Sequence, residues 1–157
     1  MKLVANYGGI KVVPFEPWHL DWIRFTPIAM GAISNCDISL EQQGRHLALS
    51  GRSYTWLAKG SIIGCAGMTP LWKGVADFWS YFGVDTFSGN KRLTLRALRI
   101  YLEEFHTEYG LHRLQAVVKA DFTEGVRFAE FFGFQNEGIM KHYGPGGEDF
   151  YRYSKFW

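Results

Sequence analysis

The chain has few features that would tie it to a metal, a disulfide framework or a membrane. Its two cysteines, Cys36 and Cys65, fit neither a zinc motif nor a disulfide framework. Its five histidines show no ligand spacing, so we expect no metal site. No apolar run approaches the roughly 18 residues that a membrane span needs. The N-terminus also lacks the apolar core of a signal peptide. These absences predict a cytoplasmic protein in a reducing compartment.

Net charge is small as well, at +2 with a pI of about 8.5. Nucleic acid binding is therefore neither demanded nor excluded, because it depends on local patches. The composition, 47% hydrophobic and 20% charged, is that of a globular protein. The length of 157 residues predicts one domain over residues 1–157. Aromatic residues are frequent and dispersed, which is more typical of dense core packing than of a surface for stacking bases.

Hydrophobic periodicity predicts strands and short helices in the first half. We expect a strand at residues 10–15, a helix opening at Pro17, and one or two short helices within residues 26–49. Three strands joined by short glycine-containing turns should then form an antiparallel meander. These three strands cover residues 54–58, 61–72 and 75–84.

In the second half, helices alternate with strands. A helix after residue 90 places apolar residues on one face and stops at Gly110. That face holds Leu95, Leu98, Leu102, Phe105 and Tyr109. A strand over residues 112–119 follows, and we expect it to lie parallel to the third meander strand through a right-handed crossover.

A further helix and a terminal hairpin complete the expected order. Asp121 and Glu124 have capping-box spacing at the start of that helix, and Gly133 ends it. Its apolar stripe consists of Val126, Ala129 and Phe132. Residues 134–140 and 150–156 should form the hairpin around the turn at residues 144–147. The whole order predicts a mixed α/β (α+β) sheet.

Positive charge is concentrated where the helix after residue 90 begins. Its first turns carry Lys91, Arg92 and Arg96. A helix N-terminus favours acids by a few tenths of a kcal/mol up to about 1 kcal/mol, so these cations oppose the local preference. Either they are solvated, or an anion binds there. We slightly favour an anion.

Three segments resemble a known family. They are residues 127–138 (RFAEFFGFQNEG), residues 143–151 with their closing hairpin, and residues 76–84 (ADFWSYFGV). From residue 53 onward the chain resembles the GCN5-related N-acetyltransferase (GNAT) superfamily, particularly the type that acetylates ribosomal protein N-termini. The resemblance implies a GNAT fold, a mixed and mostly antiparallel sheet with helices on both faces. It also implies acetyl-CoA as co-substrate and a primary amine as acceptor: a protein N-terminus, a lysine or a small amine.

The resemblance also implies where acetyl-CoA binds. Its pyrophosphate should lie on the turn after residue 84, at the N-terminus of the following helix, which is physically a favourable anion site. The family usually carries glycines in this loop where the present chain has Lys91 and Leu93. The implied contacts are Phe82, Val84, Ser88, Gly89, Asn90, Lys91, Arg92, Leu93 and Arg96.

Two residues are implied as catalytic. Asp77 matches an acidic position in the family and is our first choice for the general base, with His112 and His142 as weaker candidates. Many members carry a tyrosine as general acid where this chain has Ala129. Tyr143 is our candidate for that role.

A second interpretation keeps the fold but not the catalysis. The chain also resembles, more faintly, GNAT-like internal virion proteins of short-tailed phages, which have Ser-Gly followed by a Lys/Arg-rich helix at the same place. The basic cluster would then meet a protein or nucleic acid, in the host cytoplasm or the virion. The oligomeric state stays open, a homodimer included.

Overall fold

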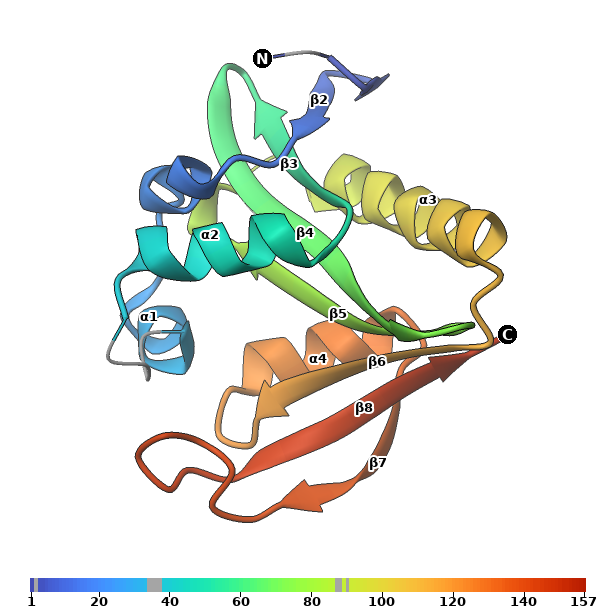
Figure 1. Cartoon of the computed structure of the whole chain (residues 1–157). Helices are drawn as coiled ribbons and strands as arrows, with labels where there is room; N and C mark the ends of the chain where they lie inside the picture. The colour runs from blue at the N-terminus through green and yellow to red at the C-terminus, as the bar shows by residue number, and fades with distance from the viewer. Residues whose placement is uncertain (2, 34–37, 87–88, 90) are drawn as a thin grey trace.

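In the computed structural model, one mixed sheet forms the centre of the molecule (Figure 1). The structure describes residues 1, 3–33, 38–86, 89 and 91–157. Within them the sheet has eight strands in the order β1-β2-β3-β4-β5-β6-β8-β7. The strands are β1 (Ala5–Tyr7), β2 (Ile10–Pro14), β3 (Ser53–Ala58), β4 (Ser61–Trp72), β5 (Val75–Phe82), β6 (Arg113–Lys119), β7 (Gln135–Met140) and β8 (Phe150–Phe156). The helices are η1 (Pro17–Trp22), α1 (Pro27–Ile33), α2 (Leu40–Ser50), η2 (Val84–Thr86), α3 (Lys91–Tyr109) and α4 (Thr123–Phe131).

The predicted meander is confirmed. Strands β3, β4 and β5 pair antiparallel in chain order. Their turns contain Lys59 and Gly60 at φ values of 50° and 84°, and Gly74 at 79°. Glycine reaches this left-handed region without steric cost, which explains why short glycine-containing turns suffice here. Strands β1 and β2 also pair antiparallel, and we did not predict this pair.

The predicted parallel pairing of β5 and β6 is confirmed as well. Strand β6 pairs parallel with β5 after the 19-residue helix α3. Strands β7 and β8 form the expected terminal hairpin, and β8 inserts between β6 and β7. All other neighbouring strands in the described sheet run antiparallel, so the sheet is mixed and mostly antiparallel.

Helices cover both faces of the sheet, as expected. One core cluster joins the strands to α3 and α4 through residues such as Leu98, Leu102 and Ala129. A second cluster lies on the opposite face, where η1 and α2 pack through Leu20 and Leu47. Figure 1 shows α2 in front of β4 and α3 on the far side of the sheet. No helix in the described part of the chain is both long and apolar enough to span a membrane.

The predicted capping box of α4 is wrong. The N-cap of this helix is Phe122, and no side chain caps it. Asp121 instead lies in the preceding turn, where its carboxylate is 3.6 Å from the Lys119 amine. Because the helix begins at Thr123, Asp121 stands one position too early to cap it. Five strand ends also differ by one or two residues: β2 stops at Pro14, β5 stops at Phe82 before η2, and β3, β6 and β7 begin at Ser53, Arg113 and Gln135.

Candidate active site

Strands β5 and β6 separate after three residue pairs. The parallel register joins Val75 to Arg113, Ala76 to Leu114, and Asp77 to Gln115. Beyond this point β5 continues along β4, and β6 continues along β8. The edges of β5 and β6 therefore diverge. A cavity of about 310 Å³ fills the space between them, bounded by α4 and α1.

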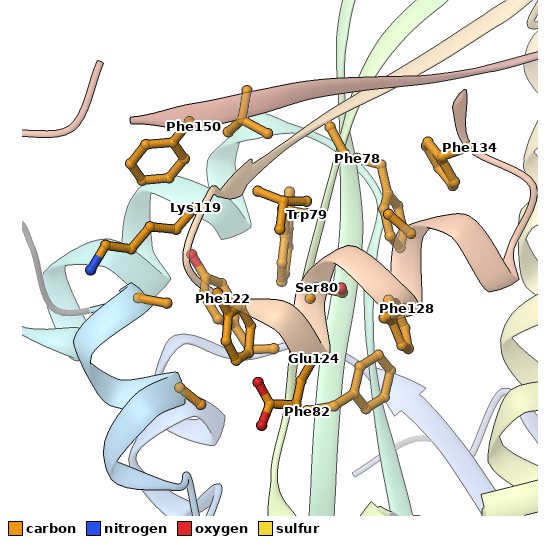
Figure 2. A pocket seen from close by; sticks show the side chains of 18 of the residues that line it. Phe78, Trp79, Ser80, Phe82, Lys119, Phe122, Glu124, Phe128, Phe134 and Phe150 are labelled. Atoms are coloured by element: carbon orange, nitrogen blue, oxygen red, sulfur yellow. The ribbon is translucent and has the colours of Figure 1, made fainter. Parts of the chain in front are cut away.

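Aromatic rings dominate the lining of this cavity (Figure 2). They come from β5, the β6–α4 turn, α4, the α4–β7 connection and the start of β8, and they are Phe78, Trp79, Tyr81, Phe82, Phe122, Phe128, Phe132, Phe134 and Phe150. Charged groups reach the lining at Lys119, the last residue of β6, and at Glu124 in the first turn of α4. Ser80 and Tyr81 contribute hydroxyl groups. Such a mostly apolar cavity with a few polar groups is typical of a small-molecule site.

Successive side chains of β5 that line the cavity belong to opposite faces of the sheet. Phe78 and Phe82 belong to the core on the α3 and α4 face. Trp79 and Tyr81 pack with the core on the η1 and α2 face. This alternation follows from the pleat of a strand, and it places Asp77 on the same face as Trp79 and Tyr81. Side chains from both faces of β5 thus contribute to the lining.

One polar contact on the α2 face escaped prediction from the sequence. The Gln43 side-chain amide, from α2, donates a hydrogen bond of 2.6 Å to the Tyr81 hydroxyl. The alternation along β5 could have signalled that Tyr81 shares the face of Asp77. The partner in α2 could not have been found in this way, because the two residues are 38 positions apart.

The basic cluster lies where α3 begins, and it is exposed. Lys91, Arg92 and Arg96 occupy the first turns of the helix, whose first turn has no acidic residue. Within the described residues, none of the three takes part in an ion pair. Gly89 has a φ of 84° just before the helix. Ser88 and Asn90 lie outside the described residues.

Of the remaining predicted cofactor contacts, Phe82 lines the cavity, whereas Val84 and Leu93 lie outside its lining. Phe82 lines the cavity, with its ring centroid 5.7 Å from that of Phe128. Val84 starts η2, where its amide donates a 2.8 Å hydrogen bond to the Arg24 carbonyl. Leu93 leans toward the β1–β2 turn, since a Cβ built on Gly8 would lie 3.5 Å from its Cδ2.

Asp77 lies where β5 and β6 part. It belongs to the last parallel pair, with Gln115, and it is half-buried. The negative charge of its carboxylate helps to raise the pKa of the neighbouring Arg113 guanidinium. The Glu137 carboxylate, which is hydrogen-bonded to Arg113, raises the pKa of that guanidinium most, and Asp77 adds a smaller contribution. Asp77 therefore precedes Phe78 of the lining, where the two strands part, and is not itself part of the lining.

Tyr143 is on the rim of the cavity, in the connection between β7 and β8. Its side chain is 53% exposed, and its ring packs edge-on against Phe150, which lines the cavity, at 5.4 Å between centroids. Ala129, at the position where the family often has tyrosine, lines the cavity as well. Tyr143 and Asp77 thus lie near different parts of the same cavity, and neither is among the residues that line it.

The two histidines proposed as weaker bases have structural contacts away from the lining. His112 precedes β6 at the paired end, where a side chain on Gly74 would overlap its ring. His142 has a φ of 54°, and its Nδ1 lies 3.2 Å from the Gly147 carbonyl oxygen within the hairpin connection. Among the described residues, no group of three or more potential metal ligands comes together.

Comparisons with known proteins find the fold but no sequence relative. No family model matches the chain, and no curated protein matches it. An acetyltransferase of the GNAT family from Bacillus anthracis is similar in structure, with a TM-score of 0.73 at 17% identity, covering 96% of both chains. The chain has the GNAT fold.

Two further structures of GNAT fold are ribosomal-protein acetyltransferases. The Salmonella typhimurium acetyl transferase that modifies the N-terminal serine of the 50S subunit protein L7/L12 has a TM-score of 0.73 at 12% identity, covering 99% of both chains. RimL, the ribosomal L7/L12 α-N-protein acetyltransferase in complex with coenzyme A, has a TM-score of 0.69 at 13% identity, covering 99% of this chain and 98% of its own.

Proposed function

We propose that this protein is an N-acetyltransferase that moves the acetyl group of acetyl-CoA to a primary amine. The observation that carries the proposal is the separation of β5 and β6, which leaves a cavity of about 310 Å³ that is lined as far as Phe82, the last residue of β5 before η2 and α3. A helix start with three exposed cations suits a pyrophosphate and a further phosphate, and the apolar cavity suits the arm that follows. Comparable GNAT-fold structures, one with coenzyme A, support the same assignment.

The residues that would hold the nucleotide end of acetyl-CoA lie around the start of α3. Lys91, Arg92 and Arg96 contact phosphates by charge, and Gly89 allows close backbone approach. Our assignment also includes Phe82, Val84 and Leu93, together with Ser88 and Asn90. Because Lys91 and Leu93 replace small residues expected in the loop, the binding depends more on side-chain charge than on backbone contact.

The chain's own groups carry the chemistry of transfer. Bound acetyl-CoA supplies the acyl group as a thioester. N–H groups on the edge of β5 that leaves β6 donate to the carbonyl oxygen as its negative charge grows. Asp77 takes a proton from the amine nitrogen, directly or through one water, as that nitrogen bonds to the carbonyl carbon. The carbon–sulfur bond breaks, and Tyr143 gives a proton to the departing sulfur. Solvent restores both residues.

Calorimetry with acetyl-CoA tests the proposal. We expect micromolar binding by the native protein and its loss in the double variant Lys91→Glu/Arg92→Glu. The matched control is Lys59→Glu/Lys73→Glu, which makes the same charge change in two exposed hairpin turns and should bind normally. Absence of binding at millimolar acetyl-CoA would overturn the proposal.

The non-catalytic interpretation predicts a different result. Salt-sensitive retention of DNA or RNA, lost in Lys91→Glu/Arg92→Glu and kept in the control, would support an interaction protein if acetyl-CoA does not bind. The resemblance to phage virion proteins stays a prediction, and this experiment tests only the interaction role that it implies.

A further inference from the structure

Gln115 is the strand partner of Asp77, in the last residue pair before β5 and β6 part. The preceding residues, Ala76 and Leu114, belong to the core on the α3 and α4 face, so Asp77 and Gln115 lie on the opposite face. Both side chains are half-buried. Because neighbouring strands are about 4.8 Å apart, a group bound at the Asp77 carboxylate lies within reach of the Gln115 side chain.

A series of hydrogen bonds holds Gln115 in place. Arg113, two residues earlier on the same face, donates from Nε to the Gln115 side-chain oxygen at 3.0 Å. The two remaining guanidinium nitrogens of Arg113 donate to the two carboxylate oxygens of Glu137. The Ser154 hydroxyl donates to the same carboxylate at 2.6 Å. Since a donor occupies its oxygen, the orientation of the Gln115 amide is set before a ligand binds.

The amide nitrogen of Gln115 is left for a ligand. Among the residues that the structure describes, this nitrogen takes part in no hydrogen bond, because the contact with Arg113 uses the oxygen alone. In the same part of the chain, the Asp77 carboxylate forms no ion pair. A hydrogen-bond donor on β6 therefore lies beside a carboxylate acceptor on β5. A ligand that matches both groups has a donating nitrogen and an accepting oxygen close together.

The cavity begins directly beyond this pair. Phe78, the next residue of β5, and Ala116, the next residue of β6, both line it. An amine that attacks a thioester in the cavity would meet the Asp77 carboxylate at this end. An amine whose adjacent carbon carries a carbonyl group holds its oxygen a few bonds from the nitrogen. That spacing suits two neighbouring side chains on paired strands.

We propose that Gln115 positions the amine acceptor by donating its side-chain N–H to a carbonyl oxygen next to the attacking nitrogen, and so selects acceptors that carry this carbonyl. The inference rests on the proposed acetyltransferase function, with Asp77 as the base. Asp77 takes the proton from the amine nitrogen, and Gln115 contacts the oxygen of the same acceptor. Arg113 acts through Gln115 and is a positioning residue. An α-amino amide fits both groups, whereas an alkylamine fits Asp77 alone.

Two probe amines that differ in the carbonyl test the inference. Alaninamide and isopropylamine carry the amine on the same branched carbon, and only alaninamide has the carbonyl oxygen. The readout is the ratio of their kcat/KM values, each referred to the unprotonated amine. We expect the native protein to favour alaninamide. The ratio should fall roughly three- to tenfold in Gln115→Met and in Gln115→Glu, the range for one lost hydrogen bond.

The two variants separate contact with the acceptor from a structural role. Gln115→Glu keeps an oxygen for Arg113 and removes only the N–H group, and any effect of its charge on Asp77 acts on both amines. The acetyl-CoA dissociation constant should not change in either variant. Gln135→Met and Gln135→Glu, at an exposed position of β7 in the same sheet, are the matched controls and should keep the native ratio.

Several results would overturn the inference. A native ratio in the Gln115 variants, or an equal fall for both amines, would remove Gln115 from recognition of the carbonyl. If neither variant folds, a native protein that acetylates isopropylamine as well as alaninamide decides against it. Binding of acetyl-CoA with no transfer to alaninamide also contradicts it. Failure of the native protein to bind acetyl-CoA is distinct, because it removes the proposed function itself.

Discussion

The hydroxyl of Thr55 lies 2.7 Å from Nδ1 of His19, in a buried contact that ties η1 to β3. The same nitrogen accepts a 3.0 Å hydrogen bond from the Glu16 amide, so the neutral ring carries its proton on Nε2. The chain of polar contacts ends at Cys65, whose sulfur is 3.3 Å from the Thr55 hydroxyl. Burial also raises the pKa of the Cys65 thiol to about 12, which keeps it protonated and unreactive.

Acid should destabilise the protein through His19. Burial lowers the pKa of this imidazole below its ordinary value of 6.5, so the unfolded chain binds more protons than the folded one in the interval between the two values. The stabilisation is complete above about pH 6.5 and is lost as pH falls through the lowered pKa. Urea unfolding at pH 7.5 and pH 5 should show this loss in the native protein and a smaller one in His19→Gln. The exposed His46→Gln should behave like the native protein.

Substitution of Gly64 should be costly. This residue of β4 pairs with Phe82 in β5, and a Cβ there would overlap the Phe82 ring. We expect Gly64→Ala to destabilise the fold by about 1–3 kcal/mol, because a packed core tolerates extra volume poorly. Gly31→Ala in α1 is the contrast, since nothing lies within 4 Å of its added Cβ. Thermal unfolding measures both, and equal melting temperatures would contradict the expectation.

Loss of the Glu137 carboxylate should weaken the C-terminal part of the sheet. Arg113 donates to it at 2.8 Å, and Ser154 donates at 2.6 Å. These hydrogen bonds, with Arg113 first, lower the pKa of Glu137 to about 2. Their stabilisation is present above about pH 4.5 and is lost as pH falls toward 2.

We expect Glu137→Gln to cost about 1 kcal/mol at pH 7, a value reduced by solvent screening of this partly exposed pair. Glu108→Gln, which breaks a more exposed ion pair with Arg52, should cost about 0.5 kcal/mol or less. Denaturant unfolding at pH 7 and pH 3 distinguishes the two variants. A Glu137→Gln cost that persists undiminished at pH 3 would argue against the charge-assisted hydrogen bonds.

If Asp77 is the general base, replacing its carboxylate by an amide should slow transfer without weakening the binding of acetyl-CoA. Asp77→Asn should lower kcat by about 10²- to 10⁴-fold, the usual contribution of such a group, and leave acetyl-CoA affinity unchanged. Asp121→Asn changes an exposed carboxylate in the turn before α4 and should keep native turnover. A native rate in Asp77→Asn would exclude Asp77 from the role.

The sequence predicted the elements whose signals are local. The strand boundaries of β4 were predicted to the residue, because glycine-containing turns bound it on both sides. Strand β1 was missed, since its three residues, Ala5–Tyr7, are too few for an alternating pattern to be recognised. The capping box at Asp121 failed because the spacing of two residues cannot show where the first helical hydrogen bond forms.

The candidate site depends more on tertiary structure. Asp77 and the basic cluster could be found from motifs along the chain: Asp77 lies where β5 and β6 part, and the cluster lies at the start of α3. The extent of the opening between β5 and β6 depends on where β6 stops pairing with β5 while it continues to pair with β8. It therefore depends on three strands together. The contacts between Gln43 and Tyr81, and between His19 and Thr55, join segments 38 and 36 residues apart. Periodicity carries no information about such pairs.

The short parallel pairing also has a mechanical consequence. Two sub-sheets, β1–β5 and β6–β8–β7, are hydrogen-bonded to each other along a seam of three residues per strand. A small rotation about that seam changes the distance between the far ends of β5 and β6 by more than it changes any contact near Asp77. The seam would serve as the pivot of such a rotation, and the separation of the far ends of β5 and β6 would change most.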